Sequence, residues 1–408
     1  MFMEMSFIIY LVGNVYLLRR AWKALAGTGV FRQIVLILYL IFSYSYFLWH
    51  KIERGRPTVF KETICAMGSF YTGVLLYLVL FTALVDLLRL IDHFFPFFPR
   101  RIRENRWKAG RAAFFAIVGI TFALLFGGMA YARHVRVNTM EIEIGKKAGE
   151  RGSLNLVFFS DIHVGPFLRT ARLEKIVEQI NSLEPDVVLI LGDIMNEEAL
   201  SSEREQLPIT LGKIQARFGV YACLGNHEHF AGIKNSLELF RKSRITALQN
   251  QAALVAGSFY LVGRSNRSYI GQNERRMPLK EILKDADMNL PVILMDHQPV
   301  RLEEAAEAGV DLELCGHTHG GAVFPITLVD NLFYEISRGY GRKLNTQYYV
   351  TSGVGVWTPP ARIGTTSEIV QMKVKFLPPI KLAKRVLTPN LFGVFFFFGV
   401  ACRPTIHF

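Results

Sequence analysis

The stretch "LNLVFFSDIH", Leu154 to His163, is an apolar run that ends in polar residues. Such a run is typical of a strand whose two faces are both covered by other elements. The next segment, "RTARLEKIVEQINSL", carries apolar residues at helical spacing: Leu173, Ile176, Val177 and Ile180. A buried strand followed by an amphipathic helix predicts the first unit of a layered α/β fold.

The same alternation continues toward Lys375 in a series of short apolar runs separated by polar turns. These runs are "DVVLILGD", "GVYACLGNHE", "FYLVGR", "PVILMDHQP", "LELCGHTHGG", "QYYVTSGVGV" and "EIVQMKV". Helical stretches are expected between several of them, including Asn235–Lys242 and Val300–Ala308. The region therefore reads as α/β, with helices or a second sheet covering the strands.

Five of these strands end in polar clusters, which hold six of the ten histidines of the chain. A single His or Gly-Asp after a strand is ordinarily a loop or turn residue. In layered α/β folds, however, the carboxyl ends of strands converge on ligand sites. We therefore expect one shared site built from the clusters: Asp161 with His163, Asp193, Asn226 with His227, His297, and His317 with His319.

The residue types in these clusters predict the chemistry of the site. Carboxylate, imidazole and amide donors without thiolate suit Mn²⁺, Fe, Zn²⁺ or Ni²⁺ better than Ca²⁺. Seven such ligands exceed one tetrahedral site, and they match two ions about 3.5–4 Å apart, as used in phosphoester hydrolysis. Glycines precede Asp193, Asn226 and His317, where they let the backbone turn sharply.

In this order, the motifs D-x-H, G-D, G-N-H-E, a lone His after a strand, and G-H-x-H resemble the calcineurin-like metallophosphoesterase superfamily. The later "TSGVGVWTPPARIG" resembles its membrane-associated bacterial phosphohydrolase branch. The resemblance covers Leu154 to Lys375. It implies a four-layer α/β/β/α metallophosphoesterase sandwich, here preceded by an all-α transmembrane region.

The resemblance also implies roles for the residues that match the motifs. Asp161, His163 and His319 would hold one divalent ion. Asn226, His297 and His317 would hold the other, and Asp193 would bridge both together with a water or hydroxide. His227 would be a catalytic residue and not a ligand, because it is placed to hydrogen-bond the phosphate and protonate the leaving group. The implied activity is metal-dependent hydrolysis of a phosphomonoester, phosphodiester or pyrophosphate.

The chain departs from the protein-phosphatase branch just after the bridging position. That branch has an Asp followed by Arg there, whereas this chain has Asn196 and Glu197. The acidic partner of the residue matching His227 is therefore missing from that position, which argues against a serine/threonine protein phosphatase. Glu228 and Glu197 are candidate substitutes for that acidic partner.

Other polar residues invite comparison with phosphate-binding groups. His229 is a candidate substrate contact, and the guanidinium fork of an arginine fits phosphate. For all of them a solvated loop position is the favoured interpretation, and no site is assigned. The candidates are Arg264, Arg267, Arg275, Arg276, Arg338, Tyr340, Arg342, Lys343 and Arg362.

The first third of the chain has a different composition, with apolar segments concentrated before Arg133. Mean hydropathy over the chain is +0.25, and the segments are Phe7–Leu18, Ile34–Trp49, Phe70–Leu90 and Ala112–Ala132. The last two approach the ~20 residues that cross a bilayer. A cleaved signal peptide is an alternative for the first, disfavoured because a basic n-region is lacking. A buried helix is an alternative for the second.

Lysine and arginine placement predicts the orientation. The formal net charge is +13, but the basic residues flank apolar segments without a basic–aromatic stripe, so nucleic acid is not an expected partner. The loops at 19–32 and 100–111 are the most basic, which places them in the cytoplasm and the rest of the chain outside. The prediction is a multi-pass protein of the cytoplasmic (inner) membrane.

These observations predict three regions: a transmembrane anchor of about four helices at 1–135, a catalytic domain at 150–375, and a tail of undecided structure at 376–408. The main hypothesis is a membrane-anchored dinuclear-metal phosphoesterase, for which a lipid-linked phosphate is a candidate substrate. The alternative is a membrane sensor or transport-associated protein with a regulatory metal-binding outer domain. Few charges lie centrally in the apolar segments, which disfavours a carrier.

The four cysteines, Cys65, Cys223, Cys315 and Cys402, are scattered and have no C-x-x-C spacing. They predict neither a disulfide framework nor a structural zinc site. Cys223 and Cys315 lie inside apolar runs and are expected to be buried.

Overall fold

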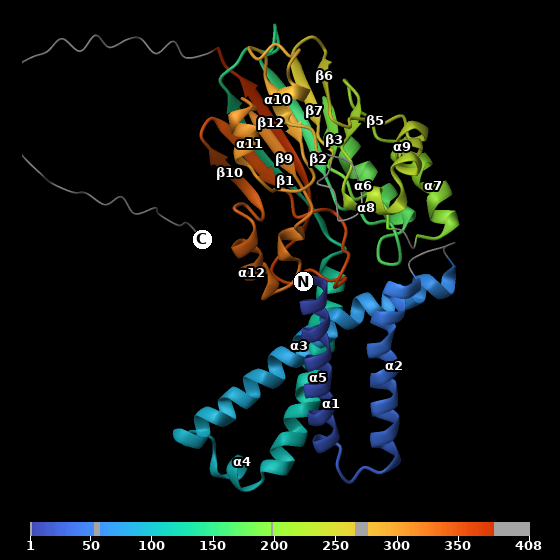
Figure 1. Ribbon diagram of the computed structural model, residues 1–408, viewed down its shortest axis with the longest axis vertical. Helices are drawn as coiled ribbons and strands as arrows, with labels where there is room; N and C mark the ends of the chain where they lie inside the picture. The colour runs from blue at the N-terminus through green and yellow to red at the C-terminus, as the bar shows by residue number, and fades with distance from the viewer. Residues whose placement is uncertain (1, 53–57, 197–198, 266–275, 379–408) are drawn as a thin grey trace, which may run out of the picture.

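The chain folds into a helical part and a layered α/β part, which lie end to end in the computed structural model (Figure 1). The structure describes residues 2–52, 58–196, 199–265 and 276–378. The helical part consists of α1 (Phe2–Ala24), α2 (Val30–Ile52), α3 (Val59–Phe94), α4 (Arg100–Glu104) and α5 (Arg106–Tyr131).

Three helices in the described part of the chain are long and apolar enough to cross a membrane: Val30–Leu48, Val59–Phe94 and Arg106–Tyr131. Many of their side chains point away from the protein, as Ile37 and Leu38 do. The second, third and fourth apolar segments of the sequence lie in these helices. The first segment lies in α1, which does not meet the same criterion.

The layered part contains two six-stranded sheets. The first has the order β1-β12-β2-β3-β4-β5, and the second has the order β10-β11-β9-β8-β7-β6. The first sheet comprises β1 (Val135–Ile144), β12 (Ser367–Phe376), β2 (Ser153–Phe159), β3 (Val187–Ile190), β4 (Val220–Ala222) and β5 (Thr246–Ala247). The second comprises β10 (Gly339–Lys343), β11 (Thr346–Val350), β9 (Leu312–Cys315), β8 (Val292–Met295), β7 (Phe259–Gly263) and β6 (Gln251–Val255).

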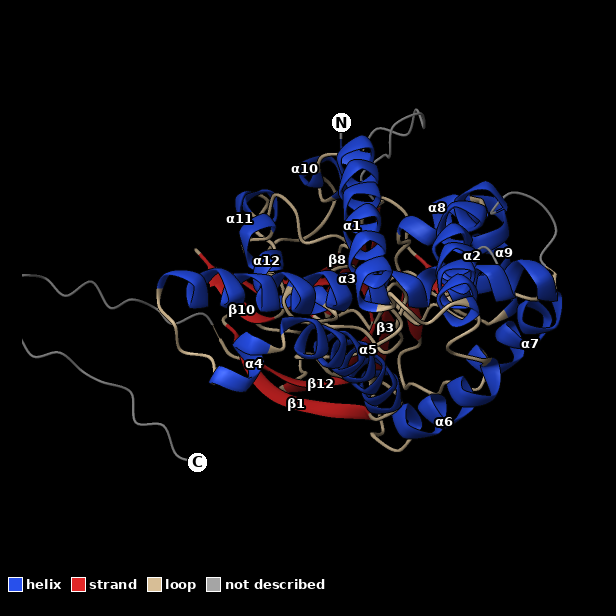
Figure 2. Cartoon of the chain, turned by 90° about the horizontal axis from the view of Figure 1, so that it is seen from below, coloured by secondary structure: helices blue, strands red, loops and turns tan. Residues whose placement is uncertain are grey.

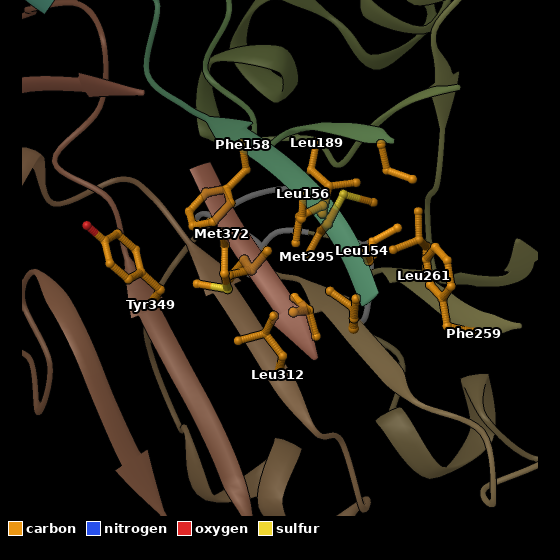
Figure 3. Close-up of a cluster of buried hydrophobic side chains, with 14 of the residues drawn as sticks. Leu154, Leu156, Phe158, Leu189, Phe259, Leu261, Met295, Leu312, Tyr349 and Met372 are labelled. Atoms are coloured by element: carbon orange, nitrogen blue, oxygen red, sulfur yellow. The ribbon is translucent and has the colours of Figure 1, made fainter. Parts of the chain in front are cut away.

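The main core lies between the two sheets (Figure 3). Side chains on a strand alternate between its faces, so β2 serves two cores at once. Leu156 and Phe158 pack in the core between the sheets, together with residues of the second sheet such as Leu312. Val157 and Phe159 point to the opposite face of the first sheet. That face is covered by α6 (Thr170–Asn181), α7 (Ser201–Leu211) and α9 (Ile233–Lys242).

The outer face of the second sheet is covered in the same way. Val262, Val292 and Leu294 pack there with Leu283 and Leu302, which lie at the ends of two short helices. These helices are α10 (Leu279–Ile282) and α11 (Glu303–Glu307). The order helices, sheet, sheet, helices confirms the four-layer α/β/β/α fold expected from the sequence.

Strand β1 lies between the two regions expected at 1–135 and 150–375. It begins four residues after α5 ends and pairs with β12 along its whole length, from Val135 opposite Ser367 to Ile144 opposite Phe376. The chain therefore passes from the last long helix directly into an edge strand of the first sheet. Of the tail at 376–408, residues 379–408 lie outside the described residues.

Helices α3 and α5 make specific contacts with the layered part. The two terminal nitrogens of the Arg169 guanidinium donate to the Glu62 carboxylate of α3, at 2.6 and 2.7 Å. The Ser69 hydroxyl donates to the backbone carbonyl of Trp357 at 2.7 Å. The backbone N–H of Arg362 donates to the carbonyl of Gly128 in α5 at 3.1 Å. The helical part is therefore joined to the loop after β11, as well as through β1.

Replacing Gly128 with Val tests this contact. A Cβ at Gly128 would lie 2.8 Å from Cγ1 of Ile363 and 3.1 Å from Cβ of Ala361. We expect Gly128→Val to destabilise the protein by about 1–3 kcal/mol through overpacking. Gly127→Val is the matched control, because a Cβ there meets nothing within 4 Å. Thermal unfolding in detergent measures both, and equal melting temperatures would contradict the contact.

Candidate metal centre

The seven predicted ligand positions come together at the carboxyl ends of parallel strands. Strands β2, β3 and β4 run parallel in the first sheet, and β8 and β9 run parallel in the second. The side chains that follow these strands meet where the ends of the two sheets lie together, and none of them is exposed. They are Asp161 and His163 after β2, Asp193 after β3, Asn226 after β4, His297 after β8, and His317 and His319 after β9.

The first group of donor atoms comes from Asp161, His163 and His319. The two imidazole Nε2 atoms are 3.2 Å apart, and they lie 3.8 and 3.7 Å from Oδ1 of Asp161. Nδ1 of His163 is 2.8 Å from Oδ1 of Asn196, an oxygen that can only accept. Nδ1 therefore carries the proton, which leaves the Nε2 lone pair of His163 directed at the group.

The second group comes from Asn226, His297 and His317. Oδ1 of Asn226 is 3.2 Å from Nε2 of His297 and 2.9 Å from Nδ1 of His317. Nδ1 of His297 donates to the backbone carbonyl of Leu191 at 2.6 Å. This bond fixes the tautomer of His297 and leaves its Nε2 as the donor atom of the group.

Asp193 belongs to both groups. Its Oδ2 lies 3.2 Å from Nε2 of His297 and 3.8 Å from Nε2 of His163. Its Oδ1 accepts the backbone N–H of His227 at 2.9 Å. One buried carboxylate thus lies between two sets of nitrogen and oxygen donors, as a bridging ligand would.

Burial and neighbouring charges set the protonation of these groups. Burial lowers the pKa of His163 to about 3 and that of His317 to about 4, so both rings are neutral and can donate a lone pair. Burial also opposes a charge on His297, but the Asp193 carboxylate outweighs it and raises the pKa of His297 to about 10. A cation bound at Nε2 of His297 would replace that proton. Burial would raise the pKa of Asp193, yet the facing histidines, His297 foremost, hold it well below its usual range.

Several of these residues have backbone conformations that L-residues rarely adopt. The φ angle is positive at five of the seven, namely Asp161 (53°), His163 (50°), Asp193 (54°), His317 (72°) and His319 (52°). Each such residue costs on the order of 1–3 kcal/mol, and such strain gathers at functional sites. The surrounding layers maintain these conformations and direct the side chains inward.

The glycines next to the ligands serve mainly to allow close packing. A Cβ on Gly316 would lie 2.6 Å from Oδ2 of Asp161, and one on Gly225 would lie 2.6 Å from the backbone N of Asp193. Of the three glycines expected to permit sharp turns, only Gly192 has a positive φ, of 88°. The other two are small because neighbouring ligand loops approach them.

The donor set fits two divalent cations. It is largely buried and contains nitrogen and oxygen atoms without thiolate. Asp161, His163 and His319 form one group, and Asp193, His297 and His317 form another. A third group, which joins these two, consists of His163, Asp193 and His227. Such donors suit Mn²⁺, Fe, Zn²⁺ or Ni²⁺ and do not by themselves select among these metals.

His227 lies beside the first group of donor atoms. It is the second residue of the short helix α8 (Asn226–Ala231), and it is almost completely buried. Its ring centre is 4.7 Å from that of His163 and 5.0 Å from that of Trp357. The ring is therefore held next to the predicted ligands by packing between two aromatic neighbours.

Glu228, which was a candidate acidic partner for His227, binds backbone groups instead. Its two carboxylate oxygens accept the N–H groups of Asp193 and Ile194, both at 2.8 Å, and of Gly225 at 2.7 Å. Burial and the Asp193 charge raise the pKa of Glu228. Glu228 thus joins the ligand loops after β3 and β4. The other candidate, Glu197, lies outside the described residues.

The remaining polar candidates have structural surroundings that differ from solvated loops. His229 is buried, and its Nε2 has no hydrogen-bond partner among the described residues. Arg264 is also buried, forms an ion pair with Glu304 at 2.5 Å and lies 3.8 Å from the Asp296 carboxylate, which Arg276 contacts as well. The solvated-loop interpretation was therefore wrong for His229 and Arg264. Arg267 and Arg275 lie outside the described residues.

The candidates near the chain's last strands are mostly surface groups. Arg338 donates to the carbonyl of Gly364 at 2.8 Å, and Lys343 pairs with Glu335 at 2.9 Å. The Tyr340 hydroxyl donates to the side chain of Gln347 at 3.0 Å. Arg342 lies near the turn that follows it, with Nε 3.4 Å from the carbonyl of Leu344. None of these contacts brings a side chain to the predicted ligands.

Arg362 supports the site in a way that was not predicted from the sequence. It is 1% exposed, and its guanidinium donates to the backbone carbonyls of His319 (2.7 Å), Ser352 (2.5 Å) and Gly355 (2.7 Å). Its backbone is bonded to α5, as described above. Arg362 therefore braces the loop of a predicted ligand against the loop that contacts the helical part. From the sequence, a solvated loop position was favoured for the arginine in "TPPARIG", and its burial shows that this interpretation was wrong.

Two sheets between helical layers, with a buried donor set at their strand ends, define the class of metallophosphoesterases. A family model described as calcineurin-like phosphoesterase matches residues 154–321. An uncharacterised metallophosphoesterase of Helicobacter pylori is 30% identical over 67% of this chain and 72% of its own length. The chain belongs to the calcineurin-like phosphoesterase family.

Two further relatives match the chain almost from end to end. A "transmembrane protein with metallophosphoesterase domain" of Danio rerio is 29% identical over 90% of this chain and 87% of its own length. An uncharacterised metallophosphoesterase of Campylobacter jejuni is 27% identical over 92% and 99%, respectively. Together with the three apolar helices, the zebrafish relative's name indicates that this chain is associated with a membrane.

Asn196 offers a test of the first donor group. Removing its amide in Asn196→Ala frees the His163 ring to rotate and change tautomer. Loss of such a supporting bond ordinarily weakens metal binding about 10–100-fold. We expect this loss in Mn²⁺ titrations of the metal-stripped protein, with the fold retained by circular dichroism. Asn289→Ala is the control, since Asn289 bonds only to Asp287 among the described residues. Equal affinities in the two variants would remove Asn196 from the site.

Proposed function

We propose that this chain is a membrane-anchored phosphoesterase that uses two divalent cations to hydrolyse a phosphate ester. The observation that carries this proposal is the position of Asp193, whose Oδ2 lies between two separate sets of donor atoms. Membership of the calcineurin-like family supports metal-dependent phosphoester hydrolysis in general terms. The phosphomonoester, phosphodiester or pyrophosphate nature of the substrate, and a link to a lipid, belong to the proposal.

In this proposal each donor group holds one cation. Asp161, His163 and His319 hold the first. Asn226, His297 and His317 hold the second, and Asp193 contacts both. When bound, such a pair neutralises phosphate oxygens and lowers the pKa of water enough to supply a nucleophile near neutral pH.

The remaining chemistry falls to His227. Its ring lies next to the first donor group, and one of its nitrogens comes within 4.8 Å of donor atoms of His163 and Asp193. In this proposal His227 contacts the phosphate and not a cation. It donates a hydrogen bond to a phosphate oxygen and passes a proton to the departing oxygen of the ester. The packing of its ring against His163 and Trp357 fixes its direction, so that no side-chain carboxylate is needed to orient it.

Replacement of His227 tests the proposed role directly. For His227→Ala we expect hydrolysis of bis-p-nitrophenyl phosphate with Mn²⁺ to fall about 10²–10⁴-fold. The bound Mn²⁺ should stay unchanged, because the proposed role of His227 is to contact the substrate and not a cation. Asp193→Asn should lower both turnover and bound metal.

The same assay should include p-nitrophenyl phosphate and a panel of lipid phosphates, with detergent-purified full chain. A His227→Ala variant with undiminished turnover would remove the proton-donor role. A wild-type protein without metal-dependent turnover on any of these esters would overturn the proposed function as a whole.

We further propose that residues 1–135 form the membrane anchor, with the catalytic domain on the outer side of the cytoplasmic membrane. The arrangement of the helices supports this orientation. The end of α1, with Arg19, Arg20 and Lys23, and the basic helix α4 lie at the end of the helical part that is farthest from the layered domain (Figure 1). The positive-inside rule assigns that end to the cytoplasm.

Reporter fusions in a bacterial host test the orientation. Alkaline phosphatase, which folds only outside the cytoplasm, should be active when fused after Lys375, and a green fluorescent reporter at the same position should be dark. Fusions after Ala26, in the loop between α1 and α2, should give the opposite pattern. Fluorescence after Lys375 would contradict the proposed orientation.

A further inference from the structure

Helix α12 (Ile326–Phe333) presents an apolar face that no described residue covers. Leu332 is 82% exposed, Phe333 70% and Leu328 60%. The helix has a single charged residue, Asp330, which is half-buried and therefore not part of the open face. Exposed apolar side chains that gather on one helix face mark a surface that contacts protein or membrane.

This helix is joined to the helical part of the molecule. The carbonyl of Phe324, two residues before α12, accepts the hydroxyl of Tyr77 in α3 at 2.6 Å. The N–H of Phe324 donates to the carbonyl of Ile363, in the segment that contacts α5. Figure 1 shows α12 at the end of the layered domain that faces the long helices, and Figure 2 shows it from below next to α3. The open face of α12 therefore lies where a bilayer around these helices would end.

The same helix is joined to the metal centre. The chain reaches α12 seven residues after His319, and Tyr334 follows its last turn with its ring centre 6.4 Å from that of His317. On the other side of the centre, the Trp357 ring lies beside His227, and its backbone accepts from Ser69 of α3. Half-exposed Phe230 completes this aromatic border, 5.6 Å from the His227 ring.

We propose that α12 is an interfacial helix whose open face lies in the lipid leaflet next to the catalytic domain. It holds the metal centre at the bilayer surface, so that the site takes phosphate esters carried by lipids of the same membrane. An amphipathic helix with Leu and Phe on one face binds the boundary between headgroups and acyl chains in this way. We expect the bilayer to cover this face because α12 lies next to helices that are long and apolar enough to cross a membrane. The substrate part of this inference rests on the proposed phosphoesterase function, and the membrane contact does not.

A fluorophore on α12 tests the membrane contact without any need for activity. The full chain carrying Leu332→Cys and Cys402→Ser would be labelled with a nitrobenzoxadiazole maleimide and placed in phosphatidylcholine nanodiscs. The other cysteines, Cys65, Cys223 and Cys315, are buried. Leu254→Cys in β6 is the matched control, because Leu254 is an exposed leucine on a strand at the opposite end of the layered domain (Figure 1).

We expect the label at position 332 to emit at shorter wavelength than at 254 and to be quenched by nitroxide-labelled phospholipid. Emission at 332 that matches 254 would overturn the proposal. A shift to shorter wavelength without quenching by the lipid would also overturn it, since a second copy or another protein would then cover α12.

Paired substrates test the consequence for catalysis. Leu332→Glu with Phe333→Glu should lower hydrolysis of lipid phosphomonoesters and lipid-linked diesters in nanodiscs about tenfold or more, because charge removes the helix from the interface. Hydrolysis of soluble p-nitrophenyl phosphate should be unchanged, and Leu254→Glu should alter neither rate. An equal loss of activity on soluble and lipid substrates, or no loss of activity on the lipid substrates, would overturn the proposal that the site takes phosphate esters carried by lipids. A wild-type chain inactive on every ester would defeat the proposed function, while the fluorescence result would still decide the position of α12.

Discussion

The contact between the Asp193 carboxylate and the His297 imidazole, 3.2 Å apart, joins the carboxyl ends of the two sheets at the centre of the site. Asp193 follows β3 of the first sheet and His297 follows β8 of the second. Both groups are buried, so the Asp193 charge needs compensation by a proton on His297 or by a cation in its place. The core between the sheets sets their separation, and this separation decides whether the two donor groups share one carboxylate. The four-layer packing therefore determines whether the site can form.

A second set of contacts keeps the donor atoms directed inward. Glu228 accepts three backbone N–H groups from the loops after β3 and β4, so a buried carboxylate is stabilised by the loops that it orders. The Leu191 carbonyl and the Asn196 side chain fix the tautomers of His297 and His163. Arg362 holds the backbone of His319. These supporting groups contact the predicted ligands but are not themselves predicted to bind a metal. They help to maintain the positive φ angles observed at five of the predicted ligand positions.

The sequence allowed the layers, and the convergence of the polar strand ends, to be predicted because both leave local patterns. Strands such as β2 and β9 are largely buried on both faces, and each is followed by a predicted ligand. Strand β1, "VRVNTMEIEI", was not predicted because it lies at an edge, and its side chains alternate between partly buried and exposed. The glycines next to the predicted ligands were identified from the sequence. At Gly225 and Gly316, however, glycine is required because neighbouring loops pack closely, and not because the chain turns there.

The surroundings of other side chains could not be predicted from the sequence pattern, because the residues that they contact are distant in sequence. Arg264 is buried by Glu304 and Asp296, which follow it by more than thirty residues. Asn196 was seen as a departure from a family pattern, and its bond to His163 appears only in three dimensions. Helix α12 was not predicted because its face is apolar toward the outside, the reverse of a helix on a soluble domain. In the proposal above, that reversal lets α12 contact the membrane.

The central claim is that two donor groups sharing Asp193 hold two ions close together. Electron paramagnetic resonance of the metal-stripped full chain titrated with Mn²⁺ tests it most directly. At two Mn²⁺ per chain, the account predicts the multiline spectrum of an exchange-coupled pair, because a shared carboxylate transmits the coupling between nearby ions. Only the isolated hyperfine pattern of uncoupled Mn²⁺ at that loading would contradict it.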